Sequence, residues 1–180
     1  MKTVAWGISG AGHFLREILP LVASLEEVDL FYSRAASEVT RMYRCRDFLD
    51  GVARKSTDES DYSSFASCRF AAGAYDLCII APATSNTVAK CSLGIADTLL
   101  TNLFAQGGKF GVPLVVLPTD VEEEVLSLSI SGKPLSLRSR PVDLEHVKKL
   151  ETFSGVRVVR SPEELALLLR REGCCKREED

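Results

Sequence analysis

The chain has 180 residues, 46% of them hydrophobic, and a formal net charge of −3 at pH 7. This length and apolar content suit one domain, residues 1–180, with a substantial core. The small negative charge, without a long basic run, argues against non-specific nucleic-acid binding. No apolar run reaches the roughly 18 residues that a membrane-spanning helix needs, so we expect no membrane partner.

Six cysteines are spread through the chain, and none forms a CxxC pair. Zinc and iron–sulfur frameworks place cysteines at short, regular spacings. We therefore predict no metal site and a reduced, cytoplasmic setting, which the lack of a signal-peptide pattern at the N-terminus supports. Cys174 and Cys175 lie next to a charged tail, which favours an irregular chain end over a redox pair.

The first predicted unit is a strand at residues 3–9, a turn at Gly10-Ala11-Gly12 and a helix at about residues 13–25. Apolar residues at three- and four-residue steps predict the packing face of that helix: Phe14, Ile18, Leu21, Val22 and Leu25. Glycines in the turn let a ligand approach the backbone closely. Their GxxGxG spacing differs from the GxGxxG fingerprint of dinucleotide-binding proteins.

A second strand is predicted at residues 28–33 and a helix at residues 35–44, with Val39, Met42 and Tyr43 inward. A NAD site would place an acidic residue near the end of this strand, but the chain has Ser33 and Arg34 there. Arg34 suits the 2′-phosphate of NADP, so NADP remains an alternative ligand. Ser33 suits a monophosphate held between two loops equally well. Residues 46–67 are polar and irregular, which predicts a surface excursion that either reaches a ligand or subunit or is a plain loop.

The third predicted strand, at residues 76–81, is a continuous apolar run typical of a strand buried on both faces of a parallel sheet. A polar turn follows it, formed by Pro82, Ala83, Thr84, Ser85, Asn86 and Thr87. Thr84 or Ser85 can cap a helix that we predict over residues 88–106, with a bend near Gly94. Hydroxyl and amide groups at a helix N-terminus suit an anion or polar ligand, and an ordinary capped helix is the alternative.

The rest of the chain continues the alternation of strands and helices. A strand is predicted at residues 112–118, an acidic segment capped by Asp120 at residues 121–126, and a hairpin within residues 128–138. A helix capped by Asp143, a short strand at residues 156–159 and a helix capped by Ser161, with Pro162 at its first position, that runs to Arg171 follow. We therefore predict an α/β three-layer sandwich whose mostly parallel, Rossmann-like or flavodoxin-like sheet is flanked by helices.

Ligands of such sheets bind beyond the carboxyl ends of the strands. Small and hydroxyl residues occupy three of these ends, at residues 9–12, at Ser33 and at residues 82–87, without paired Lys or Arg and without a Walker lysine. This favours one phosphate bound at helix N-termini, as in a mononucleotide such as FMN. His13 adjoins the glycine turn, where it either contacts the ligand or is merely structural. No Ser-His-Asp pattern or metal-binding His pair can be assembled, so the sequence identifies no catalytic residue.

Three ordered segments resemble one family of flavoproteins. GISGAGH (residues 7–13), APATSNT (81–87) and GIADTLLTN (94–102) are similar to motifs of the homo-oligomeric flavin-containing cysteine decarboxylase superfamily. The segments GAGH and PATSNTVAK are more similar to the corresponding motifs of the archaeoflavoproteins and the acceptor-type dihydromethanopterin reductases. The resemblance continues through VLPTD and RPVDLEHVKKLETFSGV, and so covers nearly the whole chain.

The resemblance implies non-covalently bound FMN. It places the phosphate side at Ser9, Gly10 and Ser33, and the ribityl chain, phosphate and ring along residues 82–87. In this family the flavin lies at a subunit interface within trimers or multiples of trimers. Asp97 and Thr98 would lie near that interface.

The chain also departs from the family in ways that bear on function. Residues 65–75 lack the histidine of the decarboxylases, LPTDVEEE replaces their Met-Asn motif, and Asn102 stands where the related prenyltransferases have an arginine. We therefore expect an FMN redox protein that takes electrons from a ferredoxin-like donor and passes them to a small-molecule or protein acceptor. A pterin reductase of the dihydromethanopterin type, a cysteine-derivative decarboxylase and a non-enzymatic flavin-binding protein remain the alternatives.

Overall fold

The computed structural model describes residues 2–59 and 65–176. Its main sheet has six parallel strands in the order β3-β2-β1-β4-β5-β8. The strands are β1 (Thr3–Ile8), β2 (Glu27–Tyr32), β3 (Lys55–Asp58), β4 (Leu77–Ala83), β5 (Leu114–Pro118) and β8 (Val156–Val158). Counted along the chain, this is the order of a doubly wound Rossmann-type sheet. The predicted α/β class is confirmed.

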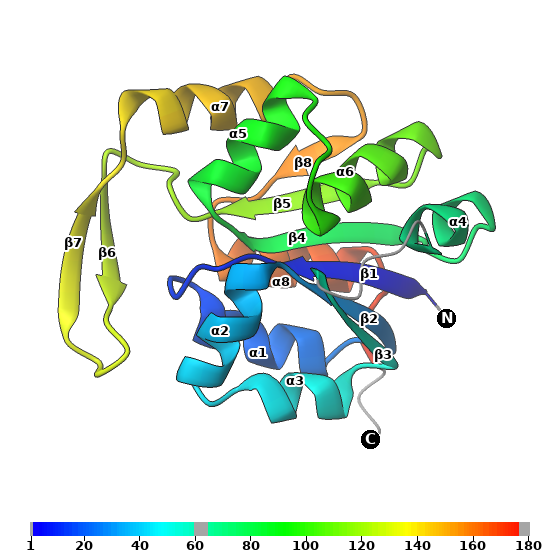
Figure 1. Ribbon diagram of the computed structural model, residues 1–180, viewed down its shortest axis with the longest axis horizontal. Coiled ribbons are helices and arrows are strands. Elements are labelled where there is room, and N and C mark those ends of the chain that lie inside the picture. Colours follow the sequence, from blue (N-terminus) through cyan, green and yellow to red (C-terminus); the bar gives the residue numbers. More distant parts are fainter. Residues whose placement is uncertain (1, 60–64, 177–180) are drawn as a thin grey trace.

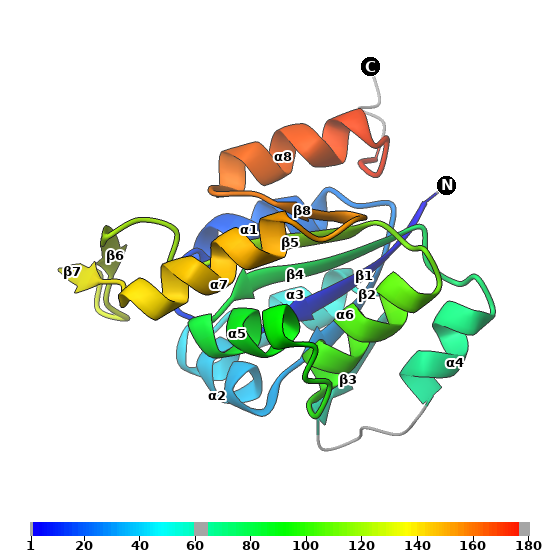
Figure 2. The ribbon, with the colours of Figure 1, turned by 90° about the horizontal axis from the view of Figure 1, so that it is seen from above.

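Helices cover both faces of the sheet and complete three layers (Figures 1 and 2). One core cluster joins the sheet to α1, α2, α3 and α8, and the other joins it to α4, α5, α6 and α7. Trp6 and Ile79 point into the first cluster, whereas Ala5 and Ile80 point into the second. Both faces of β1 and β4 are therefore buried, which explains their continuous apolar sequences. The helices are α1 (Leu15–Ala23), α2 (Arg34–Met42), α3 (Arg46–Val52), α4 (Phe65–Ala71), α5 (Ser85–Leu93), α6 (Leu99–Lys109), α7 (Pro141–Glu151) and α8 (Pro162–Arg171).

The strand order reverses between β1 and β4. The chain continues from β1 to β2 on one side of the sheet, whereas β4 and β5 extend it on the other. The segments that follow β1 and β4 diverge at the carboxyl edge, where doubly wound sheets bind ligands. A separate antiparallel hairpin, β6 (Glu124–Leu128) and β7 (Pro134–Arg138), lies beyond this edge (Figure 1).

The prediction of an irregular surface excursion at residues 46–67 is wrong for most of its length. It contains α3 and β3, and its later part includes the start of α4; residues 60–64 lie outside the described residues. The strand pairs in parallel with residues 29–32 of β2 at the edge of the sheet. Although the sequence of β3 is polar, the strand is stabilised by this pairing and by the Arg46 guanidinium, which donates hydrogen bonds to both carboxylate oxygens of Asp58 at 3.1 and 2.8 Å.

Two predicted helices also differ from the structure. The helix predicted at residues 88–106 is two helices, because α5 ends at Gly94 in the left-handed conformation (φ 75°) and α6 begins after Thr98. Residues 121–126 form no helix capped by Asp120, since the chain runs from β5 into β6. The hairpin is present, but it begins at Glu124 rather than after residue 127.

Several side chains lie elsewhere than predicted. Asp143 is in the first turn of α7 rather than at its cap, and its carboxylate accepts hydrogen bonds from the backbone and guanidinium of Arg140. Met42 is 59% exposed, and Ala36 and Thr40 are the fully buried residues of α2. Phe14 precedes α1 rather than beginning it. The chain around the adjacent cysteines is ordered rather than irregular, because Cys174 is buried in the first cluster and Cys175 forms an antiparallel bridge with Leu25.

No helix in the described parts of the chain is both long and apolar enough to cross a membrane.

Candidate functional site

Ser9 joins the two segments that diverge at the switch in strand order. It follows β1 and is 1% exposed. Its hydroxyl donates to the carbonyl oxygen of Pro82 at 2.6 Å and accepts from the backbone N–H of Thr84 at 2.9 Å. Ser9 therefore fixes the turn after β1 against the start of α5.

The N-termini of three helices surround one cavity of about 240 Å³, next to the turn that follows Ser9. The hydroxyls of Ser33, Thr84 and Thr98 cap α2, α5 and α6, each accepting from a backbone N–H within the first turn of its helix. Helix N-termini carry partial positive charge and unpaired N–H groups, and both favour an anion. Six predicted site residues line this cavity, which we call the anion cavity: Gly10, Ser33, Thr84, Asn86, Thr87 and Thr98.

Gly10 brings the turn after β1 against the start of α2. A Cβ atom at this position would lie 2.3 Å from the Ala35 Cβ, far inside van der Waals contact. Only glycine therefore permits this close approach, and the anion cavity keeps its shape because no side chain separates the two segments.

A second cavity of about 530 Å³ lies between these segments and the hairpin. The sheet side contributes five predicted residues: Ala11, Gly12, His13, Thr84 and Ser85. The hairpin contributes a mostly apolar wall that includes Val125, Leu128, Leu135 and Leu137. Thr84 lines both cavities. A polar cavity for an anion adjoining a larger apolar one fits a phosphate monoester that carries a flat ring system. We call the second one the ring cavity.

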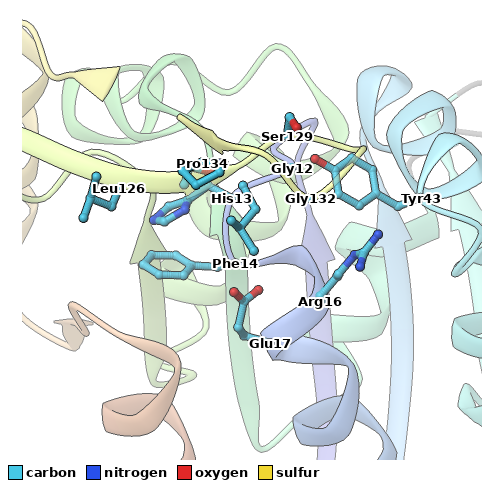
Figure 3. A pocket seen from close by; sticks show the side chains of 12 residues that line it. Gly12, His13, Phe14, Arg16, Glu17, Tyr43, Leu126, Ser129, Gly132 and Pro134 are labelled. Carbon is cyan, nitrogen blue, oxygen red and sulfur yellow. The ribbon is translucent and has the colours of Figure 1, made fainter. Parts of the chain in front are cut away.

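A third cavity of about 280 Å³ adjoins the ring cavity through Gly12 and His13. It lies between the start of α1 and the hairpin, and Figure 3 shows the side chains of Arg16, Glu17 and Tyr43 around it. The Arg16 guanidinium lies 5.6 Å from the centre of the Tyr43 ring, within the range of a cation–π contact. A second small molecule in this cavity would lie next to the occupant of the ring cavity.

His13 lies between the ring cavity and the third cavity, and its ring contacts that of Phe14 in a tilted arrangement with 3.7 Å between ring centres. Burial lowers the pKa of His13, and the negative charges of Glu17 and Asp120 only partly offset this effect. An ordinary histidine titrates near pH 6.5, so the imidazole is neutral at pH 7. It can thus offer one hydrogen-bond donor and one acceptor to a ligand.

The remaining predicted site residues lie apart from these cavities. Pro82 and Ala83 are buried in the end of β4. Asp97 is exposed, and the ammonium of Lys90 donates to its carboxylate at 2.9 Å. This hydrogen bond lowers the pKa of Asp97. Asp97 therefore orients Lys90, which does line the anion cavity.

Sequence reasoning missed Lys90 and Glu59 as lining residues of the anion cavity. Lys90 follows Asn86 by four residues on the same helix, a spacing that places both on one face and was a usable signal. Glu59 directly follows β3, a strand with no apolar pattern to reveal it. Across residues 2–59 and 65–176, no three His, Cys, Asp or Glu side chains gather in a way that could hold a metal ion.

The family model described as Flavoprotein matches residues 1–179. DmrB of Burkholderia xenovorans, solved in complex with FMN as a cubic protein cage for redox transfer, superposes with a TM-score of 0.84. It is 35% identical, and the match covers 95% of this chain and 94% of DmrB.

Two archaeal relatives are also similar to this chain. A dihydromethanopterin reductase (acceptor) from Methanosarcina mazei is 41% identical over 141 residues, which are 70% of this chain and 58% of the reductase. The match thus spans little more than half the length of that relative. An uncharacterised protein from Methanocaldococcus jannaschii is 35% identical, and the match covers 92% of both chains.

Proposed function

Because this chain belongs to the Flavoprotein family, we propose that it is an FMN-dependent oxidoreductase that passes electrons from a donor to an acceptor. The observation that carries the proposal is the junction of the anion cavity and the ring cavity at Thr84. The relative DmrB, whose fold closely matches this one, binds FMN. A phosphate monoester joined to a flat ring is the shape of ligand that the two cavities accommodate.

Within this proposal the chain binds and orients the cofactor, and FMN supplies the electron-transfer chemistry. Residues around the three helix N-termini would hold the phosphate: Gly10, Ser33, Thr84, Asn86, Thr87 and Thr98. Ala11, Gly12, His13 and Ser85 would contact the ring side. Ser9 acts indirectly, because it joins the two segments that carry these residues.

A ferredoxin-like protein is the donor that we propose, and the acceptor is a small molecule or a protein. Reduction of a pterin is the second candidate, supported by the 41% identity to a dihydromethanopterin reductase. The third cavity would place such an acceptor beside His13 and the ring cavity. The missing family histidine in residues 65–75 argues against the decarboxylase alternative.

Absorption spectra and rapid-mixing kinetics test the proposal. The purified protein, supplied with FMN, should show flavin absorption bands. Its bound flavin should be reduced by reduced ferredoxin faster than by NADH or NADPH. Bleaching followed by reoxidation with a dihydropterin would identify the pterin reaction, and reduction without turnover of any acceptor would favour a flavin-binding protein. A protein that shows no flavin bands contradicts the whole proposal.

The substitution Asn86→Asp tests the phosphate position. It puts a negative charge into the anion cavity, and we expect FMN affinity to fall roughly tenfold, the effect of about 1.4 kcal/mol of repulsion. The change is measured by quenching of flavin fluorescence. Gln106→Glu on α6 makes the same chemical change outside the three cavities and should leave the affinity unaltered. Equal FMN binding by both variants would contradict the assignment.

We also propose that the chain is a homo-oligomer, a trimer or a multiple of one. The hairpin exposes apolar side chains, above all Leu126, which is 80% exposed. Leu126→Asp should lower the mass measured by light scattering after gel filtration, because burying a carboxylate in an apolar interface is costly. Leu167→Asp, at a 53% exposed position on α8, is the control. An unchanged mass for the first variant would remove the hairpin from the interface.

A further inference from the structure

Glu59 occupies the part of the anion cavity where two helix N-termini converge. One carboxylate oxygen accepts a hydrogen bond from the backbone N–H of Arg34 at 2.8 Å, and the other accepts from the backbone N–H of Leu99 at 3.2 Å. Arg34 and Leu99 are the first residues of α2 and α6. The carboxylate thus satisfies N–H groups that a helix leaves without partners.

The same N–H groups suit a phosphate equally well. They belong to two helices whose N-terminal charge favours any anion in this position. The other polar groups of the cavity include the hydroxyls of Ser33 and Thr84 and the ammonium of Lys90. Lys90 is already paired with Asp97. Arg34 also lines the cavity, but a phosphate at the backbone N–H groups of Arg34 and Leu99 would need the same two donors that Glu59 uses. The two anions therefore compete for these donors and repel each other at contact.

We propose that Glu59 is a placeholder for the cofactor phosphate, and that it sets how strongly this chain prefers FMN to riboflavin. The proposal rests on the proposed function. In the cofactor-free protein the Glu59 carboxylate stabilises the starts of α2 and α6. Binding of FMN breaks the two hydrogen bonds of the Glu59 carboxylate. The cost of displacing this carboxylate therefore offsets part of the free energy of phosphate binding. Riboflavin lacks the phosphate and leaves Glu59 in place.

The isosteric substitution Glu59→Gln separates this role from a purely structural one. It removes the competing charge, and we expect the dissociation constant of FMN to fall roughly tenfold, about the effect of one charge-assisted hydrogen bond. The dissociation constant of riboflavin should stay the same. The melting temperature of the cofactor-free protein should decrease, because the two helix N-termini lose their anion. If Glu59 served only to stabilise the fold, its substitution would change the melting temperature without changing the ratio of the dissociation constants of FMN and riboflavin.

Both dissociation constants are measured by quenching of flavin fluorescence in the wild type, Glu59→Gln, Glu59→Ala and the control Glu38→Gln. Glu38 is an exposed residue of α2 that does not line the anion cavity. Both Glu59 variants should tighten FMN alone, and Glu38→Gln should change neither constant. An unchanged or weaker FMN affinity overturns the proposal, as does tightening by glutamine but not by alanine, which would trace the effect to the new amide. Wild-type protein that binds neither flavin overturns the proposed function as well.

Discussion

Gly10→Ala should weaken FMN binding about tenfold to hundredfold. The added Cβ would lie 2.3 Å from the Cβ of Ala35 and 3.2 Å from its carbonyl carbon. Overpacking of this kind costs about 1–3 kcal/mol, and the structure can relieve it only by moving the turn after β1 away from α2. That movement separates the groups proposed to hold the phosphate. Fluorescence titration with FMN measures the loss.

A compensating substitution makes this test specific. Ala35→Gly removes the methyl group that the new side chain meets, so the double variant Gly10→Ala/Ala35→Gly should recover most of the affinity. Gly51→Ala is the matched control, because nothing lies within 4 Å of a Cβ placed at Gly51 in α3. If the double variant binds FMN as weakly as Gly10→Ala, the contact between the two segments does not determine the affinity.

Asp29→Asn should destabilise the protein by about 3 kcal/mol, the usual cost of breaking a buried ion pair by removing one partner. Asp29 lies in β2 and is 1% exposed. Its carboxylate accepts hydrogen bonds from the Arg54 guanidinium at 2.9 and 3.0 Å and from the Tyr75 hydroxyl at 2.8 Å. Arg69 of α4 pairs with it at 2.7 Å. The substitution would leave two arginines without their shared anion, and urea unfolding measures the lost free energy.

The pH dependence of this effect follows from the pKa of Asp29. Burial alone would raise this pKa, but the hydrogen bonds from Arg54 and Tyr75 and the charge of Arg69 outweigh burial and lower it. A lowered pKa in the folded state stabilises the protein at pH values above the unfolded pKa of about 4, and this contribution is lost as pH falls through the folded value. The difference between wild type and Asp29→Asn should therefore shrink in acid.

Glu27→Gln is the control for the same network. Glu27 also accepts from Arg54, at 2.9 Å, but its side chain is 28% exposed. An exposed pair of this kind contributes up to about 1 kcal/mol. Equal destabilisation by Glu27→Gln and Asp29→Asn would show that burial of Asp29 does not determine its contribution.

Local sequence patterns predicted the central elements of the fold because those elements are buried on regular faces. The apolar runs of β1 and β4 are typical of central parallel strands, which are buried on both faces. Trp6 and Ile79 lie in one core cluster, and Ala5 and Ile80 lie in the other. Ser161 and Pro162 mark the start of α8 by local chemistry alone, and this helix was predicted to the residue. The polar residues after β1, β2 and β4 likewise predicted an anion site without knowledge of the strand order.

Elements whose stability comes from distant partners were not predictable in this way. The edge strand β3 has a polar sequence and depends on pairing with β2, and Gly94 indicated a bend where the tertiary structure has two separate helices. The position of Glu59 is the clearest case, because its carboxylate meets Arg34 and Leu99 across 25 and 40 residues of sequence. Sequence patterns report the periodicity of one segment at a time. Only the register of the parallel sheet decides which helix N-termini converge, and therefore which anion they hold.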